Sequence, residues 1–182
     1  MADMAQRITP LAGQHGGSVV ASLTPAEPAS RISLRAGAEA VSALSKALGV
    51  DLPTKPKTSA SGKGRSALWL GPDEWLIIGP EGDDLKALAA KSKALHSATD
   101  ISHRNTAILV SGKKAAEAIN CACPQDLSLS AFPVGACSRT VFGKIEVVLF
   151  RTSADTFRME CWRSFSTYAF EMLKHGAEDA AL

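Results

Sequence analysis

The hydrophobic positions of the chain predict a protein built mainly of strands, with a few helices between them. Two apolar runs, residues 67–70 and 75–78, flank the polar tetrapeptide Gly-Pro-Asp-Glu at 71–74. Short apolar runs bounded by turn-forming residues are typical of strands buried on both faces. Proline has its φ preset near about −65°, which suits the second position of a tight turn. The stretch 67–80 therefore predicts a buried hairpin.

Further strands are expected in short or alternating runs of strand-forming residues. They are residues 31–35, 99–102, 106–110, 138–142, 145–150 and 156–162. A Gly-Lys pair at 143–144 separates two of them, and a Gly-X pair suits a type II′ hairpin. In the last strand Phe157, Met159 and Cys161 alternate with charged residues, which predicts that one face packs on a core.

Helical periodicity and capping residues predict four helices between these strands. The first lies at 38–48 and ends at Gly49, and the second runs from the caps Asp83 and Asp84 to about Leu95. The third follows Gly112 and runs through about Asn120. The last runs from the cap Ser164 to His175 and is stopped by Gly176. Glycine favours such ends because it adopts the left-handed conformation readily.

Two segments lack either pattern. Residues 1–30 are rich in Ala, Gly, Ser and Pro and predict an extended arm, with one short strand near 19–23. The sequence leaves open whether this arm is disordered or lies on a partner. Residues 53–65 predict a basic loop, whose charges either keep it solvated or meet an acidic partner surface.

A weak internal repeat relates the two halves of the chain. A shift of 75 residues aligns Leu34 with Leu109 and Gly37 with Gly112. The identities are few, and the shared order of elements carries more weight than the matched letters. A strand–helix–strand–strand–helix unit used twice predicts an α+β fold of two related ferredoxin-like (split βαβ) modules, with antiparallel sheets covered by helices.

These patterns divide the chain into three parts. We expect an extended N-terminal arm at 1–30, a single α+β domain at 31–176 and a C-terminal tail at 177–182. The domain is expected to consist of two modules, at about 31–97 and 98–176.

Composition narrows the class of protein. The 182 residues are 46% hydrophobic and 21% charged, which is ordinary for a soluble globular domain. A net charge of +2 argues against a nucleic-acid binder. No apolar run approaches the length of a membrane helix, and the amino terminus lacks the apolar segment of a secretory signal. The four cysteines do not make a disulfide framework, so we expect a cytoplasmic location.

The cysteines and histidines form no recognisable motif. Cys121 and Cys123 make a single Cys-x-Cys pair, with Cys137 and Cys161 elsewhere, whereas structural zinc sites usually show two closely spaced pairs. The histidines, at positions 15, 96, 103 and 175, are scattered. A Cys–His nucleophile pair is left open, but no combination is singled out.

Two polar clusters remain as candidates for chemistry. The tetrapeptide Ser-His-Arg-Asn at 102–105 either binds a ligand or forms the turn of a hairpin, and its composition favours the turn. Asp73 and Glu74 are adjacent carboxylates, which usually diverge in a turn and so do not suit general acid–base catalysis. A Gly-x-Gly-x-x-Gly fingerprint is absent. We therefore predict no catalytic, cofactor-binding or metal-binding residues in this chain.

Several stretches together resemble the gamma subunit of heterotetrameric sarcosine oxidase. The most specific is Leu-Trp-Leu-Gly-Pro-Asp-Glu-Trp-Leu-Ile-Ile at 68–78. The supporting stretches are Thr-Asp-Ile-Ser-His-Arg-Asn-Thr at 99–106, Pro-Gln-Asp-Leu-Ser at 124–128, Phe-Pro-Val-Gly-Ala-Cys-Ser-Arg-Thr at 132–140 and Arg-Ser-Phe-Ser-Thr-Tyr-Ala-Phe-Glu-Met-Leu at 163–173. The resemblance covers about residues 31–175.

The resemblance implies a fold similar to the folate-binding part of the glycine-cleavage aminomethyltransferase. It also implies a complex that oxidatively demethylates sarcosine to glycine, releases hydrogen peroxide and can pass the one-carbon unit to tetrahydrofolate as the methylene form. The FAD, FMN, NAD, zinc and tetrahydrofolate are expected in the alpha, beta and delta subunits, with no cofactor in this chain. No nucleic-acid or membrane partner is expected.

Three hypotheses for function follow. The leading one is a non-catalytic subunit that docks on the catalytic subunits and stabilises their assembly. The alternatives are a module that contributes to a folate pocket, in the groove between the two halves, and a stand-alone aminomethyltransferase-like protein.

Overall fold

The computed structural model describes residues 9–182 of the chain, and within them it shows an α+β fold with two antiparallel sheets and four α-helices. The strands are β1 (Gly16–Gly17), β2 (Ser22–Pro25), β3 (Ala29–Ala36), β4 (Ser59–Gly62), β5 (Arg65–Gly71), β6 (Glu74–Pro80), β7 (His96–Asp100), β8 (Asn105–Ser111), β9 (Cys137–Phe142), β10 (Ile145–Ser153) and β11 (Thr156–Trp162). The helices are α1 (Val41–Leu48), α2 (Leu85–Ala90), α3 (Ala115–Asn120) and α4 (Ser166–Asp179), with 3-10 turns at Ala38–Ala40 and Arg163–Phe165. The predicted α+β class with antiparallel sheets is confirmed.

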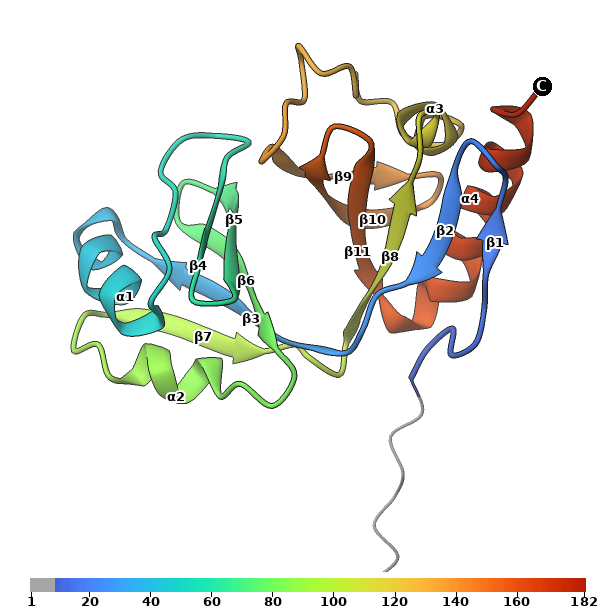
Figure 1. Ribbon diagram of the computed structural model, residues 1–182. Helices are drawn as coiled ribbons and strands as arrows, with labels where there is room; N and C mark the ends of the chain where they lie inside the picture. Colours follow the sequence, from blue (N-terminus) through green and yellow to red (C-terminus); the bar gives the residue numbers. More distant parts are fainter. Residues whose placement is uncertain (1–8) are drawn as a thin grey trace, which may run out of the picture.

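The two sheets face each other, and each carries its helices on the opposite face (Figure 1). The five-stranded sheet has the order β4-β5-β6-β3-β7, and the six-stranded sheet has the order β1-β2-β8-β11-β10-β9. Helices α1 and α2 pack on the first sheet, and α3 and α4 pack on the second. Since successive side chains of a strand point to opposite faces, each central strand supplies one core under the helices and a second core between the sheets.

The hairpin predicted at 67–80 is confirmed as β5 and β6. Trp69 pairs with Trp75, and Gly71 pairs with Glu74 across the turn. Every residue of β6 except Pro80 is buried, as expected for a strand covered on both faces.

The helix predicted at 38–48 is confirmed as a 3-10 turn followed by α1. Gly49 ends it in the left-handed conformation, with φ of 69°.

The predicted cap of the second helix, Asp84, is also confirmed, because its carboxylate accepts a hydrogen bond from the backbone N–H of Ala87. The end predicted near Leu95 is wrong: α2 stops at Ala90, and Leu95 is 88% exposed. The residues that follow pair with β3 as β7, and this pairing replaces further helical hydrogen bonds.

Both predicted ends of the last helix are wrong. Neither Ser164 nor any other side chain caps it, and α4 begins at Ser166 after a 3-10 turn. The helix also runs through Gly176 to Asp179, so it extends into the predicted tail. Gly176 lies against α3, where a Cβ atom would overlap the carbonyl oxygen of Ala118. This glycine therefore allows two helices to approach closely and does not act as a stop signal.

The predicted arm and basic loop both contain strands. Residues 1–8 lie outside the described part of the chain, but β1 and β2 belong to the six-stranded sheet, and Leu23 is buried in its core. The described part of the arm thus lies on this chain's own sheet.

In the predicted basic loop, residues 59–62 form β4, which joins β5 through Lys63 and Gly64, both with positive φ. Strand β4 has the sequence Ser-Ala-Ser-Gly, which lacks the apolar alternation that identifies a strand.

The tetrapeptide at 102–105 does not turn a hairpin, and that prediction is wrong. It leads from β7 in the five-stranded sheet to β8 in the six-stranded sheet. The segment between β2 and β3 makes the same crossing earlier in the chain. The two crossings lie together between the sheets (Figure 1). Within residues 9–182, no helix is long and apolar enough to cross a membrane.

Candidate functional site

The space between the two sheets holds the most unusual chemistry of the described chain. Its apolar part is a cluster from both sheets, consisting of Ala29, Leu68, Leu76, Ile78, Ile101, Cys137, Val148 and Phe150. Two charged groups flank this cluster. We call Arg31, Arg158 and Glu160 the Glu160 cluster, and Arg35, Glu74 and Arg139 the Glu74 cluster.

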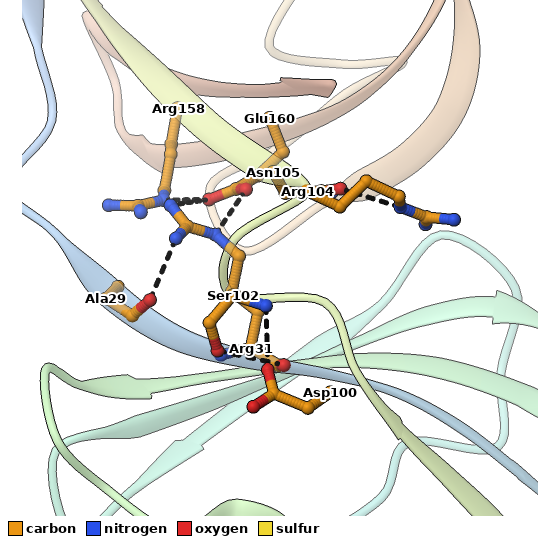
Figure 2. Close-up of polar contacts among 8 residues, drawn as sticks. All are labelled: Ala29, Arg31, Asp100, Ser102, Arg104, Asn105, Arg158 and Glu160. Atoms are coloured by element: carbon orange, nitrogen blue, oxygen red, sulfur yellow. Dashed lines mark hydrogen bonds and ion pairs between the residues drawn. The ribbon is translucent and has the colours of Figure 1, made fainter. Parts of the chain in front are cut away.

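The Glu160 cluster joins β3 to β11 through a buried ion pair. The Arg31 Nε donates to Glu160 Oε2 at 2.7 Å, and Nη2 donates to Oε1 at 3.2 Å. The two side chains are 2% and 0% exposed. Arg158 Nε adds a second cation to the same carboxylate, at 2.8 Å from Oε1 (Figure 2). Taking these charges out of water is unfavourable, and their hydrogen bonds compensate for part of that loss.

Arg31 also forms hydrogen bonds that fix the crossing between β7 and β8. The backbone N–H of Arg31 donates to the Ser102 hydroxyl at 2.8 Å, and Arg31 Nη1 donates to the Ala29 carbonyl at 3.0 Å (Figure 2). The Ser102 N–H donates in turn to Asp100 Oδ1 at 2.8 Å. These hydrogen bonds from Ser102 hold the pKa of the Asp100 carboxyl below its usual value. The crossing is therefore held by a continuous network from both sheets.

The Glu74 cluster makes a second link between the sheets, at the turn of the β5–β6 hairpin. Arg139 of β9 donates two hydrogen bonds to the Glu74 carboxylate, at 2.8 and 3.0 Å. Arg35 of β3 adds a third at 2.9 Å. The bonds from Arg139 lower the pKa of Glu74, although partial burial opposes the change. The Glu74 side chain is 10% exposed, so solvent screens these interactions only in part.

We expect the Glu74 cluster to stabilise the protein at neutral pH and to lose this effect in acid. Since the pKa of Glu74 is lower in the folded chain than in the unfolded chain, the stabilisation is present above the unfolded value of about 4.3 and disappears as the pH falls through the folded value. Glu74→Gln should lower the free energy of unfolding by about 1–3 kcal/mol at pH 7, the usual loss when a buried hydrogen-bond partner is removed. Urea denaturation at pH 7 and at pH 3 measures the difference from wild type.

The difference should narrow at pH 3, because the unfolded chain takes up a proton at Glu74 below its own pKa and the stabilisation by the ionised carboxylate is then progressively lost. The pKa values of Asp83 and Asp100 are also lowered by their hydrogen bonds, so both proteins lose stability in acid. A difference that is the same at both pH values would contradict an ionic role for Glu74.

The cysteine thiols are poorly suited to nucleophilic chemistry. Burial raises the pKa of Cys137 to about 12 and that of Cys161 to about 12. Burial also raises the pKa of Cys121, while Cys123 lies in the core under α3. The thiolate is the reactive form, and little of it exists at neutral pH for a thiol with so high a pKa.

Two of the histidines have neighbours other than these thiols. Nδ1 of His96 lies 2.8 Å from the Ala94 carbonyl, and the exposed side chain of His175, on α4, lies 3.8 Å from Glu178 Oε2. Within residues 9–182, no group of three or more His, Cys, Asp or Glu side chains is placed to hold a metal ion. The absence of catalytic and binding residues remains a prediction.

A small cavity lies between the sheets and is bordered by both charged clusters. Its volume is about 40 Å³, and its lining includes Glu74, Arg139, Glu160 and Trp162. Cofactor pockets usually measure about 300–1,000 Å³. The cavity therefore has room for ordered water between the charged groups. Two larger hollows are open depressions. One of about 350 Å³ lies beside α2 and the crossing, with Arg31 and Ser102 in its lining, and one of about 600 Å³ lies beside α1.

An exposed group of aromatic and cationic side chains lies where the crossing meets the start of α4. The rings of Trp162 and Phe165 stack at 5.9 Å, and the Arg104 guanidinium lies 4.9 Å from the centre of the Trp162 ring. The sequence predicted a helix that begins at the cap Ser164, but Phe165 lies in the 3-10 turn before α4 and is 39% exposed. Helical periodicity could not reveal this group, since its residues come from two distant segments.

Sequence comparison relates the chain to one family. The family described as sarcosine oxidase, gamma subunit, matches residues 35–179. Sarcosine oxidase subunit gamma of Corynebacterium sp. strain P-1 is 33% identical over 150 residues, which span 80% of this chain and 74% of that protein. The subunit of the same name from an Arthrobacter species is also 33% identical over 150 residues, spanning 80% of this chain and 73% of the relative.

Similar chains among the solved structures include the following two. One, from the heterotetrameric sarcosine oxidase of Corynebacterium sp. U-96 in complex with pyrrole 2-carboxylate, has a TM-score of 0.83 and 26% identity, covering 89% of this chain and 86% of that one. The other, the glycine cleavage system aminomethyltransferase T of Bartonella henselae, has a TM-score of 0.65 and 16% identity, covering 85% of this chain and 45% of that one. At this identity the second match shows a shared fold alone.

Proposed function

The chain belongs to the sarcosine oxidase gamma subunit family, and from this membership we propose that it is a non-catalytic subunit of a heterotetrameric sarcosine oxidase. In this role it docks on the catalytic subunits and stabilises their assembly. The observation that carries the proposal is the match to a chain of such an oxidase, with a TM-score of 0.83 over 86% of that chain. The match covers 89% of this chain, so most of its helices and strands have a counterpart in that chain.

The complex that we propose oxidises sarcosine to glycine with oxygen, releases hydrogen peroxide and passes the one-carbon unit to tetrahydrofolate. Its FAD, FMN, NAD, zinc and tetrahydrofolate are held by the alpha, beta and delta subunits, which are the partners of this chain. A dinucleotide fingerprint is not present in this sequence, in keeping with that division. The four cysteines are free, which supports a cytoplasmic location.

We further propose that the chain contains two related split βαβ modules, at about 31–97 and about 98–176. The order β4-β5-β6-β3-β7 in one sheet corresponds, strand for strand, to β9-β10-β11-β8-β2 in the other. In this correspondence β2, from the arm, takes the place that β7 holds in the first module. The arm would then complete the second module and not stand outside the domain.

Co-expression tests the proposed role. This chain, produced with the alpha, beta and delta subunits of its own complex, is expected to co-elute with them in size-exclusion chromatography at equal stoichiometry. Omitting this chain should lower the melting temperature of the remaining complex. If the chain elutes alone while the other subunits form an active and equally stable complex, the proposal is wrong.

The folate alternative has weaker support. The fold shared with an aminomethyltransferase motivates it, but the cavity between the sheets is about 40 Å³, far below the volume of a pterin pocket. Calorimetry of the isolated chain with tetrahydrofolate decides this point, and binding at micromolar ligand would revive it. The stand-alone transferase would require methylene transfer by the chain without partners.

A further inference from the structure

The exposed aromatic group described above is assembled from two segments of the chain. We call Arg104, Trp162 and Phe165 the aromatic patch. Trp162 and Phe165 are 40% and 39% exposed, and Arg104 is also exposed. Adjoining exposed apolar side chains mark interaction sites more often than single ones do, and tryptophan and arginine are among the residues that contribute most to protein interfaces.

The patch is held in place by the backbone. Trp162 is paired with Asn105 at the end of the β11–β8 ladder, and the Arg163 N–H donates to the Arg104 carbonyl at 2.7 Å. The two segments thus cannot separate without breaking sheet hydrogen bonds. A side chain that is already fixed loses little conformational entropy when a partner covers it.

The buried Glu160 cluster is joined to the patch through short stretches of backbone. Glu160 precedes Trp162 by two residues on β11, and Ser102, which bonds the backbone of Arg31, precedes Arg104 by two residues in the crossing. Figure 2 shows that the Arg104 side chain extends away from Arg31 and Glu160, while its Nε donates to Asn105 Oδ1 at 3.2 Å. The Arg104 guanidinium thus takes no part in the Glu160 cluster, and it stacks on Trp162 at the surface.

The charge of the patch specifies the kind of surface that fits it. The segments 102–105 and 162–165 contain two arginines and no carboxylate, while Glu146 borders the same small cavity as Arg104 and Trp162. The complementary surface has an apolar pocket for two stacked rings, bordered by acidic side chains. Such complementarity steers association and favours the correct partner over others.

We propose that the aromatic patch is the anchor by which this chain docks on another subunit of the heterotetramer, at an apolar pocket bordered by carboxylates. The inference rests on the proposed function and deepens it by naming the surface. The patch lies where both sheets meet, so a partner bound there contacts the junction of the two halves.

The test measures affinity of the full chain for the remaining subunits purified as a complex. Trp162→Ala/Phe165→Ala is expected to weaken binding by about 30-fold or more, the loss typical of an interface hot spot. Arg104→Glu is expected to slow association, with a larger effect at 50 mM than at 500 mM salt, because exposed charges are screened. Leu95→Ala serves as the matched control, since Leu95 is 88% exposed beyond α2 and away from the patch.

Thermal melting checks that each variant is folded, and Arg104→Glu changes only an exposed side chain, so it keeps the test valid if the double variant is unstable. Wild-type-like affinity of both patch variants, with the wild-type chain binding normally, would overturn the inference and leave the proposed function intact. Failure of the wild-type chain to bind would overturn both. Loss of self-association alone in the patch variants would assign the patch to a second copy of this chain and also overturn the inference.

Discussion

Glu160→Gln is expected to lower the free energy of unfolding by about 3–5 kcal/mol, the loss typical of breaking a buried ion pair by removing one partner. Arg31 has a 2% exposed side chain and donates to both carboxylate oxygens of Glu160. Arg158 donates to the same group. The variant leaves two guanidinium groups facing a neutral amide, in a place where water does not replace the lost charge. Urea denaturation at neutral pH measures the change.

Two further variants separate the ion pair from a general effect of removing a carboxylate. Glu117→Gln breaks the exposed pair with Lys114, whose side chains are 45% and 57% exposed, and should change stability by less than about 1 kcal/mol. Arg31→Met/Glu160→Leu removes both charges and should be less destabilising than Glu160→Gln, since buried pairs are often replaced by apolar residues at little loss. A Glu160→Gln protein as stable as Glu117→Gln would show that the pair does not hold the sheets together.

Trp75→Ala is the second large effect, with an expected loss of about 3–5 kcal/mol, as for other large-to-small changes in a core. Trp75 is 1% exposed and packs on the five-stranded sheet under α1 and α2. Its Nε1 also donates to the Pro53 carbonyl at 2.7 Å, so the truncation leaves a cavity and removes the donor to a partly buried acceptor. Denaturant unfolding of the isolated chain measures the loss.

Trp75→Phe keeps most of the buried ring and should lose only part of that stability. Val141→Ala, at a 50% exposed position, should stay within about 0.5 kcal/mol of wild type. A Trp75→Ala chain that melts normally but fails to assemble would contradict the packing role and make Trp75 an interface residue.

Local signals predicted much of the secondary structure. The strand at 156–162 and the hairpin at 67–80 were predicted because their apolar residues are grouped or alternate over a few positions. The end of α1 at Gly49 was predicted because a glycine is available where the left-handed conformation is needed. In each case the decisive neighbours are close in sequence, so the pattern and the structure report the same contacts.

The wrong predictions came from segments whose structure is decided by distant neighbours. Strand β4 has no apolar pattern and exists because β5 offers an open edge. Helix α4 passes through Gly176 because α3 requires a residue without a side chain at that contact. The arm carries β2 because β8 is available to pair with it.

The candidate site shows the same division. The sequence by itself determined the α+β class, the main hairpin and the family resemblance, because short motifs and periodicity are properties of neighbouring residues. Only the tertiary structure decided that Glu160, predicted on the polar side of its strand, is buried against Arg31, 129 positions away, and that Glu74 binds Arg139, 65 positions away. Charge pairing depends on distance in space, and a charged residue on an alternating strand looks the same in sequence whether it faces water or a second sheet.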